Sequence, residues 1–147
     1  MDIGKLAEQL QVDEGVVHEI YRCTEGYLTF GCGHKVIERD PEYGQPEGTP
    51  VSKERINEAF QKDLEDVAID CNRLYSEFRK MPEEVKQVIG NMMFNLGLKR
   101  LAGFRKMQKA VEAGDWKLAS EEMKDSKWYR QVKTRAVRLC NRMANVR

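Results

Sequence analysis

The segment from Pro82 to Gly97, PEEVKQVIGNMMFNLG, limits the possible folds more than any other part of the chain. Proline is favoured in the first turn of a helix and glycine at its end, so these two residues bound a predicted helix. Apolar side chains occupy nearly every face of this helix, at Val85, Val88, Ile89, Met92, Met93, Phe94 and Leu96. A helix that is apolar all round must be surrounded, so we predict a helical bundle with this helix at its centre.

Other segments with helical periodicity can surround that central helix. A first helix is predicted over residues 2–11, with Asp2 as its N-cap. A long amphipathic helix is predicted over residues 52–76, where apolar side chains recur at helical spacing after Ser52. Shorter helices are predicted over residues 101–112, 115–123 and 128–145.

Residues 21–36, YRCTEGYLTFGCGHKV, follow a different pattern. Three glycines separate aromatic and β-branched residues, which is typical of a hairpin or a small sheet. Three of the four prolines then fall within residues 37–50, which indicates a loop, or a third strand and a loop.

These segments predict an α+β fold, mostly α, in which a small N-terminal β-sheet lobe is joined by a long helix to a C-terminal helical bundle. A cleft is expected between the two lobes. The whole chain, residues 1–147, is expected to be one domain. The small lobe takes residues 13–60, and the helical lobe takes residues 1–12 and 61–147.

Several classes of protein are disfavoured by the composition. No run of about 18 apolar residues is present, so no membrane helix is encoded. Residues 1–10 carry charges and lack an apolar core, so we expect no signal peptide and synthesis in the cytoplasm. The four cysteines and two histidines lack the spacing of metal ligands, and we predict neither a metal nor a cofactor.

The charge is distributed unevenly behind a net value of +1. Residues 1–98 contain 11 Lys/Arg and 19 Asp/Glu, whereas residues 99–147 contain 14 Lys/Arg and 5 Asp/Glu. A basic C-terminal third favours a polyanionic partner or substrate. Basic helix faces that are solvated, or that pack against the acidic part, explain the same pattern equally well.

Five motifs occur in order along nearly the whole chain: DEG at 13–15, YRCTEGYLTFGCGH at 21–34, NMMFNLG at 91–97, LAGF at 101–104 and SKWYRQVKTRA at 126–136. In this order and spacing they resemble the phage-type lysozymes, the endolysins of glycoside hydrolase family 24. The resemblance implies a lysozyme-like fold. It also implies hydrolysis of the β-1,4 bond between N-acetylmuramic acid and N-acetylglucosamine in bacterial peptidoglycan, with lysis of the host cell for phage release.

The resemblance carries further expectations about partners and location. We expect a monomer that binds peptidoglycan polysaccharide, without nucleic acid and without insertion into a membrane. Made in the host cytoplasm, it would reach peptidoglycan after release across the inner membrane, through a holin-type exit.

The catalytic pattern of the family, Glu then Asp or Cys then Thr, matches Glu14, Cys23 and Thr29 in this sequence. Glycoside hydrolysis needs a proton for the leaving oxygen and a group that meets the developing oxocarbenium ion. Glu14, expected at a helix end facing the cleft, suits the acid. Thr29 would hold a water or orient the attacking group through its hydroxyl.

Cys23 admits three interpretations: nucleophile, holder of the attacking water, or packing residue. An ordinary thiol has a pKa of about 8.5 and is mostly protonated at pH 7. On a strand, Arg22 points to the opposite face, and the carboxylates of Glu14 and Glu25 would disfavour a thiolate. A thiolate nucleophile implies retention of the anomeric configuration, and a held water implies inversion.

Other positions take their roles from the resemblance alone. Family cleft positions that bind substrate match Glu25, Lys35, Phe94, Asn95, Met107 and Glu122. His34 is expected to form a buried ion pair with Asp63, joining sheet to helix. Arg135 matches an arginine that reaches toward the catalytic glutamate. Phe94 and Met107 fit a hydrophobic core equally well.

Two other functions compete with lysozyme activity. A lysozyme homologue without a second carboxylate could be a catalytically weak, peptidoglycan-binding protein. A helical nucleic-acid binder would use the basic C-terminal third, in which Trp116, Trp128 and Tyr129 are interleaved with basic residues, although no recognised reading motif is present.

Overall fold

The computed structural model describes residues 1–147 and divides them into two compact units. The helical unit consists of residues 1–6 and 66–147, and the sheet unit of residues 7–65. Both boundaries fall inside helices, α1 (Ile3–Glu14) and α2 (Lys53–Leu74). The lobe boundaries predicted from the sequence, after residues 12 and 60, fall in the same two helices.

Helix α1 begins and ends where local chemistry predicts. Asp2 Oδ1 accepts a hydrogen bond from the Lys5 backbone N–H (3.0 Å), as an N-cap does. The helix stops at Glu14 because Gly15 takes a positive φ of 72°, which a glycine tolerates at low cost. Helix α2 is capped in the same way by Ser52, whose Oγ accepts from the Arg55 N–H (3.1 Å).

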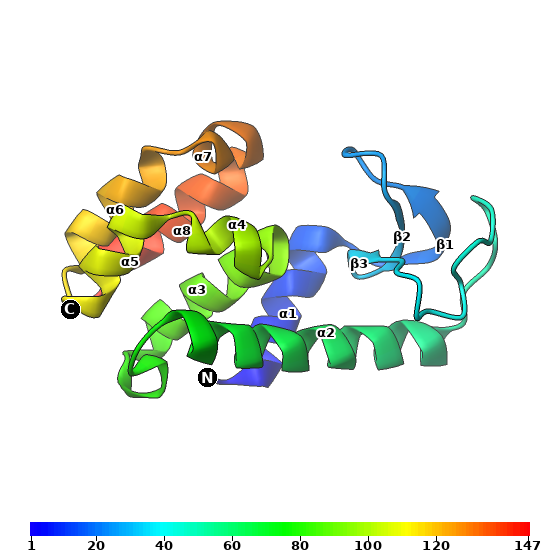
Figure 1. The fold of residues 1–147 in the computed structure, drawn as a ribbon, viewed down its shortest axis with the longest axis horizontal. Helices are drawn as coiled ribbons and strands as arrows, with labels where there is room; N and C mark the ends of the chain where they lie inside the picture. Colours follow the sequence, from blue (N-terminus) through cyan, green and yellow to red (C-terminus); the bar gives the residue numbers. More distant parts are fainter. The chain divides into compact units, whose positions relative to one another are not determined.

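The sheet unit contains one antiparallel sheet of three short strands in the order β1 (Val17–Arg22), β2 (Leu28–Gly31), β3 (His34–Lys35), at the right of Figure 1. Its apolar cluster is small and consists of Ile20, Phe30, Val51, Ile56 and Ala59. A Cβ on Gly31 would lie 2.9 Å from Ile56 Cγ2, so glycine is required where β2 approaches α2.

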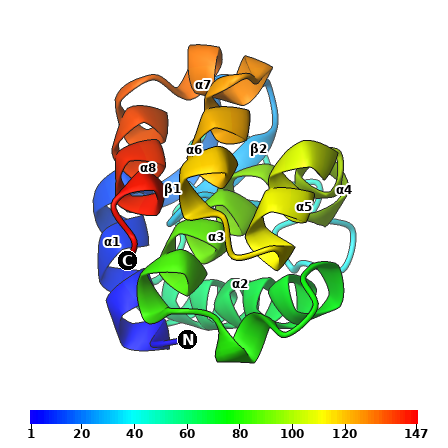
Figure 2. The same ribbon diagram turned by 90° about the vertical axis from the view of Figure 1, so that its left-hand side faces the viewer.

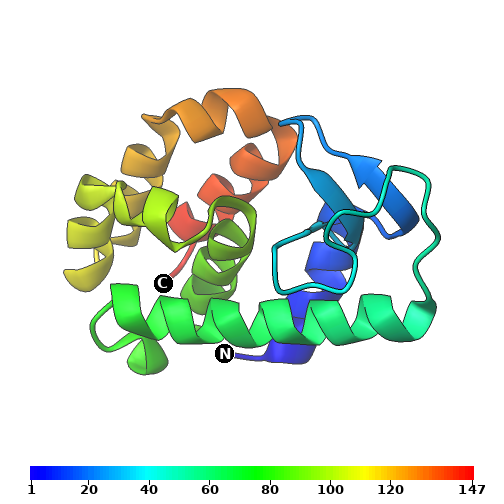
Figure 3. The same ribbon diagram turned by 45° about the vertical axis from the view of Figure 1, so that its right-hand side comes forward.

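Residues 36–52 connect β3 to α2 without forming a helix or a named strand, which confirms the predicted loop. Figure 3 shows this segment folding back beside the sheet before α2 begins. Its last part is pinned to β1 by an isolated bridge between Glu19 and Pro50 and by the Val51 N–H, which donates to the His18 carbonyl (2.9 Å).

In the helical unit, α3 (Glu83–Leu96) is the central helix that the sequence predicts. Nine of its residues are buried, on all of its faces, and it packs against α4 (Leu98–Ala102) and α8 (Thr134–Ala144). Gly97 ends α3 with a φ of 81°. Figure 2 shows α3 behind α5 (Arg105–Glu112) and α6 (Trp116–Lys124). A 3-10 turn, η1 (Phe78–Lys80), precedes α3.

Two of the predicted shorter helices are wrong in extent. Residues 101–112 contain the end of α4 and all of α5, because the backbone leaves helical geometry at Phe104 (φ −81°, ψ 63°). Residues 128–145 contain most of α7 (Lys127–Val132) and all of α8, because Lys133 has a φ of 59° and interrupts the helix.

The chain is mostly helical with one small antiparallel sheet, so the α+β class is confirmed. None of its helices combines the length and the apolarity needed to cross a membrane.

Candidate active site

Glu14 is the last residue of α1, and its carboxyl group lies against the turn that joins β2 to β3. A Cβ built on Gly33 would be 2.9 Å from Glu14 Oε1 and 3.2 Å from its Cδ. Gly33 has a φ of 65°, so both its backbone conformation and its lack of a side chain make room for the carboxyl group. The two glycines of the GCGH segment therefore allow other groups to come close to the backbone. Ile56 of α2 lies against Gly31, and Glu14 lies against Gly33.

Cys23 follows β1 and begins the tight turn to β2. Its backbone N–H donates to the Tyr27 carbonyl (2.9 Å), and its own carbonyl accepts from the Gly26 N–H (2.9 Å). Gly26 has a φ of 89°, which closes the turn. The thiol is partly exposed, unlike those of the other cysteines.

The thiol of Cys23 has a lowered pKa. Burial raises it, but backbone hydrogen bonds from Tyr27 and Glu25 act in the opposite direction and are joined by a hydrogen bond from Thr29. The positive charge of Lys35 lowers it further. The carboxylates of Glu14 and Glu25 were expected to disfavour a thiolate, but the donors of the turn and the charge of Lys35 act in the opposite direction, and the net effect is a lowered pKa.

Thr29 is 2% exposed and hydrogen bonds both the turn and the thiol. Its Oγ1 donates to the Tyr27 carbonyl at 2.9 Å. A hydroxyl group has one proton, so it cannot donate to this carbonyl and to the Cys23 sulfur at once. With a neutral thiol, the S–H donates to Oγ1. With a thiolate, the hydroxyl proton turns to the sulfur and gives up the carbonyl.

The Tyr21 side chain lies near Glu14 and Cys23, and the sequence led to no prediction for it. Burial raises the pKa of its phenol, and the negative charges of Glu14 and Cys23 raise it further. The phenol therefore stays protonated and can donate a hydrogen bond beside both groups. Tyr21 precedes Cys23 by two residues, and strand alternation alone places the two side chains on one face.

Arg22 lies on the other side of the strand and does not act on the thiol. Its Nε donates to Glu47 Oε1 (2.8 Å), and its Nη1 donates to the Gly26 carbonyl (2.8 Å). The alternation of the strand predicts this separation from Cys23.

Glu25 and Lys35, two of the predicted substrate-binding residues, lie beside the same turn. Lys35 Nζ is 3.4 Å from Glu25 Oε2 and 4.8 Å from the centroid of the Tyr27 ring. Both partners of the ion pair are about half exposed. The pair therefore contributes little to stability, but it sets the charge around the thiol.

His34 makes the predicted contact with Asp63, and a second contact that was not predicted. Its Nδ1 is 2.7 Å from Asp63 Oδ2, and its Nε2 is 2.8 Å from Asp40 Oδ2. Both ring nitrogens face carboxylate oxygens, which only accept hydrogen bonds, so this geometry favours the imidazolium form. Burial lowers the pKa of His34, but the hydrogen bonds and charges of Asp63 and Asp40 outweigh it and raise the pKa.

Arg55 extends this cluster at the start of α2. Its guanidinium contacts Asp40 Oδ1 (3.1 Å) and Glu42 Oε2 (2.9 Å), and it lies 5.6 Å from the centroid of the Phe30 ring. The cluster ties the loop after β3 to the sheet and to α2. The only sequence signal that Asp40 belongs to this cluster is its position in a proline-rich turn. No local pattern indicates that Arg55 belongs to it.

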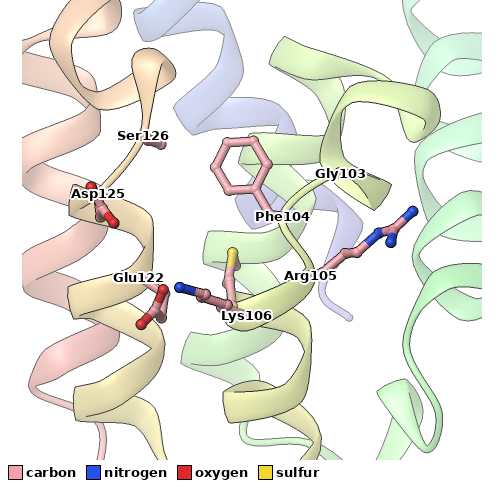
Figure 4. A pocket seen from close by; sticks show the side chains of 8 residues that line it. Gly103, Phe104, Arg105, Lys106, Glu122, Asp125 and Ser126 are labelled. Atoms are coloured by element: carbon pink, nitrogen blue, oxygen red, sulfur yellow. The ribbon is translucent and has the colours of Figure 1, made fainter.

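Two predicted substrate-binding residues of the helical unit, Met107 and Glu122, line one pocket of about 420 Å³ together with Phe104, Lys106 and Ser126. In Figure 4 the side chains of Lys106 and Glu122 point toward one another, and the Phe104 ring forms part of the wall. Met107 is 1% exposed and belongs mainly to the core.

Phe94 and Asn95 lie near the end of α3 and are partly exposed. Asn95 Oδ1 accepts a hydrogen bond from the Trp128 indole (2.8 Å), which connects α3 to α7. Arg135, on α8, donates through Nε to Asn91 Oδ1 (2.8 Å). The predicted approach of Arg135 to the catalytic glutamate stays a prediction.

The other three cysteines are buried and form no disulfide: Cys32, Cys71 and Cys140. Burial raises the pKa of Cys71 to about 12 and that of Cys140 to about 11. Both stay protonated thiols in neutral solution.

Comparison with known proteins gives the family of this chain. The family model for phage lysozyme matches residues 11–145. Two relatives from Dictyostelium discoideum, Probable T4-type lysozyme 1 and Probable T4-type lysozyme 2, are 31% and 27% identical. In both cases the match covers 93% of this chain and 92% of the relative.

The pre-baseplate central spike protein Gp5 of Enterobacteria phage T4 is 30% identical over 91% of this chain, which spans only 26% of Gp5. The relatives of similar length match almost from end to end. With a family match over nearly all of its residues, this chain belongs to the phage lysozyme family.

Proposed function

We propose that this protein hydrolyses the β-1,4 glycosidic bond between N-acetylmuramic acid and N-acetylglucosamine in peptidoglycan. Its family makes it a lysozyme-type glycoside hydrolase whose substrate class is peptidoglycan. The observation that carries the finer proposal is the arrangement of Glu14, Cys23 and Thr29 within one compact unit, with the Tyr21 phenol beside the first two.

Glu14 is the proposed general acid. It stands at the end of a rigid helix, and Gly33 leaves space for its carboxyl group. In the first step it gives its proton to the glycosidic oxygen as the C1–O bond breaks. An ionised Glu14 can then take a proton from the water that completes hydrolysis.

Cys23 is the proposed group that meets the developing positive charge, with Thr29 hydrogen bonded to it. The donors around the sulfur favour an anion, as a nucleophile or an electrostatic partner requires. If the thiolate attacks C1, a thioglycosyl enzyme forms and water later releases it, with net retention. If Cys23 and Thr29 instead hold the attacking water, the product is inverted. Anomeric analysis of the released sugar by NMR separates the two.

The remaining roles support substrate binding. Glu25 and Lys35 would contact the sugar near the turn, and Met107 and Glu122 would contact it through the pocket of the helical unit. Phe94 and Asn95 complete the proposed binding set, and His34, Asp63 and Arg135 are proposed supporting residues.

The proposed setting is lysis of a bacterial host for phage release by a monomeric endolysin that uses no nucleic acid. Made in the cytoplasm, it would cross the inner membrane through a holin-type exit. An antimicrobial effect on added bacteria follows from the same chemistry wherever peptidoglycan is accessible.

The test is release of reducing ends from purified peptidoglycan by the wild-type chain and by Glu14→Gln. The amide has nearly the same shape but cannot act as an acid, so we expect a loss of at least about 100-fold in rate. Far-UV circular dichroism checks that the variant is folded. A wild-type chain that binds peptidoglycan without releasing reducing ends would favour the binding-protein alternative.

A further inference from the structure

Lys35 shares a face of the sheet with the residues around Cys23. Lys35 is the β3 partner of Thr29, and Thr29 is the β2 partner of Tyr21. Side chains of directly opposed residues lie on the same face, so these three form one row across the sheet. Cys23 follows Tyr21 by two residues and extends toward the same face.

The ammonium group of Lys35 is held by two side chains of the turn itself. Its Nζ contacts Glu25 Oε2 at 3.4 Å and lies 4.8 Å from the centroid of the Tyr27 ring. Tyr27 is also the residue whose carbonyl accepts from the Cys23 N–H. An ion pair and a cation–π contact together restrain a flexible lysine near the thiol better than either contact alone.

We propose that Lys35 is a positioning residue for Cys23, whose ammonium group, held by Glu25 and Tyr27, stabilises the thiolate form. This inference rests on the proposed role of Cys23 in hydrolysis. Burial raises the pKa of the thiol and the hydrogen bonds of the turn lower it, and the charge of Lys35 adds to the lowering. Lys35 therefore has a task beyond contact with sugar.

The chemistry of the two versions of the family motif explains why a lysine is useful here. An aspartate is ionised at neutral pH without help, whereas an ordinary thiol is mostly neutral. A positive charge beside the turn therefore matters when this position is cysteine and matters little when it is aspartate. Lys35 and Cys23 are predicted to act as a pair.

The first experiment follows the rate at which iodoacetamide alkylates Cys23 as a function of pH, using the full chain. Iodoacetamide is uncharged, and Cys23→Ser gives the background from the three buried thiols. In Lys35→Met we expect the midpoint to rise by about half a pH unit, a modest shift because the lysine is half exposed. Lys35→Arg should keep the wild-type midpoint.

Matched controls separate this charge from general effects. Lys53→Met removes the same charge from the exposed start of α2 and should leave the midpoint unchanged. For the wild type, a higher salt concentration should raise the alkylation midpoint of Cys23, because salt screens the attraction between the half-exposed Lys35 ammonium and the thiolate. This last measurement needs no variant and remains available if Lys35→Met does not fold.

The second experiment measures peptidoglycan hydrolysis in a double-mutant cycle. At pH 7, Lys35→Met should reduce activity about threefold more in the Cys23 enzyme than in the Cys23→Asp background, as expected from the thiolate fraction lost in a half-unit shift. Loss of the sugar contact of Lys35 lowers activity in both backgrounds and cancels in this ratio. An equal loss in both backgrounds, or an unchanged alkylation midpoint, overturns the inference.

The two proposals fail in different ways. An active Cys23→Ala enzyme would remove the catalytic role of Cys23 even if Lys35 still moves the alkylation midpoint. An inactive Cys23→Ala enzyme with an unmoved midpoint in Lys35→Met would leave the proposed function in place and reject the role of Lys35.

Discussion

The sheet unit and the helical unit are held together by different means. In the helical unit, nine residues of α3 are buried, seven of them apolar or glycine. The sheet unit has three strands of six, four and two residues and a small apolar cluster. Ion pairs among His34, Asp40, Asp63 and Arg55 add to it. Polar contacts, which depend on direction, hold side chains at fixed angles, and the proposed catalytic groups lie in the unit that is rich in them.

The largest effect should come from Cys23 and fall on activity alone. Cys23→Ala should lower the rate of peptidoglycan hydrolysis by about 1,000-fold with little change in stability, because the thiol is partly exposed and packs little. Cys23→Ser should lose nearly as much, since a hydroxyl stays neutral. Cys23→Asp should keep substantial activity. Reducing-end release and thermal unfolding measure the two properties separately.

An active Cys23→Ala enzyme would show that the sheet unit does not need the Cys23 thiol for catalysis. It would mean that Glu14 and Thr29 suffice with a bound water, and that Cys23 is a packing residue in the sheet unit. Alkylation of the C32A/C71A/C140A variant offers an independent check, because Cys23 is then the only thiol present.

The next effect should fall on stability alone, in the helical unit. Ile89 is 0% exposed at the centre of α3, so Ile89→Ala should reduce the free energy of unfolding by about 3 kcal/mol through lost burial and the cavity left behind. Urea unfolding at pH 7 measures this change. Leu118→Ala on α6, at an exposed apolar position, is the control and should cost well under 1 kcal/mol. Equal costs would mean that α3 is not the core of its unit.

His34 should affect stability in a way that depends on pH. The pKa of His34 is raised, so its contribution is complete below about pH 6.5 and is lost as pH rises through the folded value. The pKa of Asp40 is lowered, despite burial, by the Ile37 backbone N–H, His34 and Arg55. Its contribution is complete above about pH 4 and is lost as pH falls through the folded value. We therefore expect maximal stability between about pH 4 and 6.5.

His34→Gln should cost about 2 kcal/mol at pH 5.5, since it removes hydrogen bonds to two carboxylates. The cost should be smaller at pH 8, where the wild type has lost part of the same contribution. The exposed His18 provides the matched control in His18→Gln. A cost that is the same at both pH values would show that the cluster does not depend on the charge of His34.

The smallest effect on stability should come from Gly33→Ala. A methyl group there meets Glu14 Oε1, and alanine disfavours a φ of 65°, which together should cost about 1 kcal/mol. The displaced Glu14 should lower activity more than this change in stability suggests. Gly44→Ala, at a φ of 87° with no neighbour within 4 Å, is the control for backbone strain alone. Equal activity of the two variants would mean that contact with Gly33 does not position Glu14.

The sequence predicts much of the fold because several of its signals are local. Asp2, Ser52 and Gly97 act on backbone groups a few residues away, so the helix boundaries that depend on them are correct. The break at Lys133 was missed because its neighbours carry neither proline nor glycine. A positive φ at a lysine is stabilised by the packing of α7 and α8 rather than by its own preference.

The amino-acid order by itself determined the central position of α3, the loop after β3, and the separation of the Arg22 side chain from Cys23. Each follows from a repeat of 3.6 or 2 residues or from the backbone limits of glycine and proline. Only the tertiary structure decided that Asp40 and Arg55 join His34, and that Lys35 and the turn donors favour a thiolate at Cys23. Those contacts join residues up to 15 positions apart, and their energies depend on burial and distance that exist only once the chain has folded.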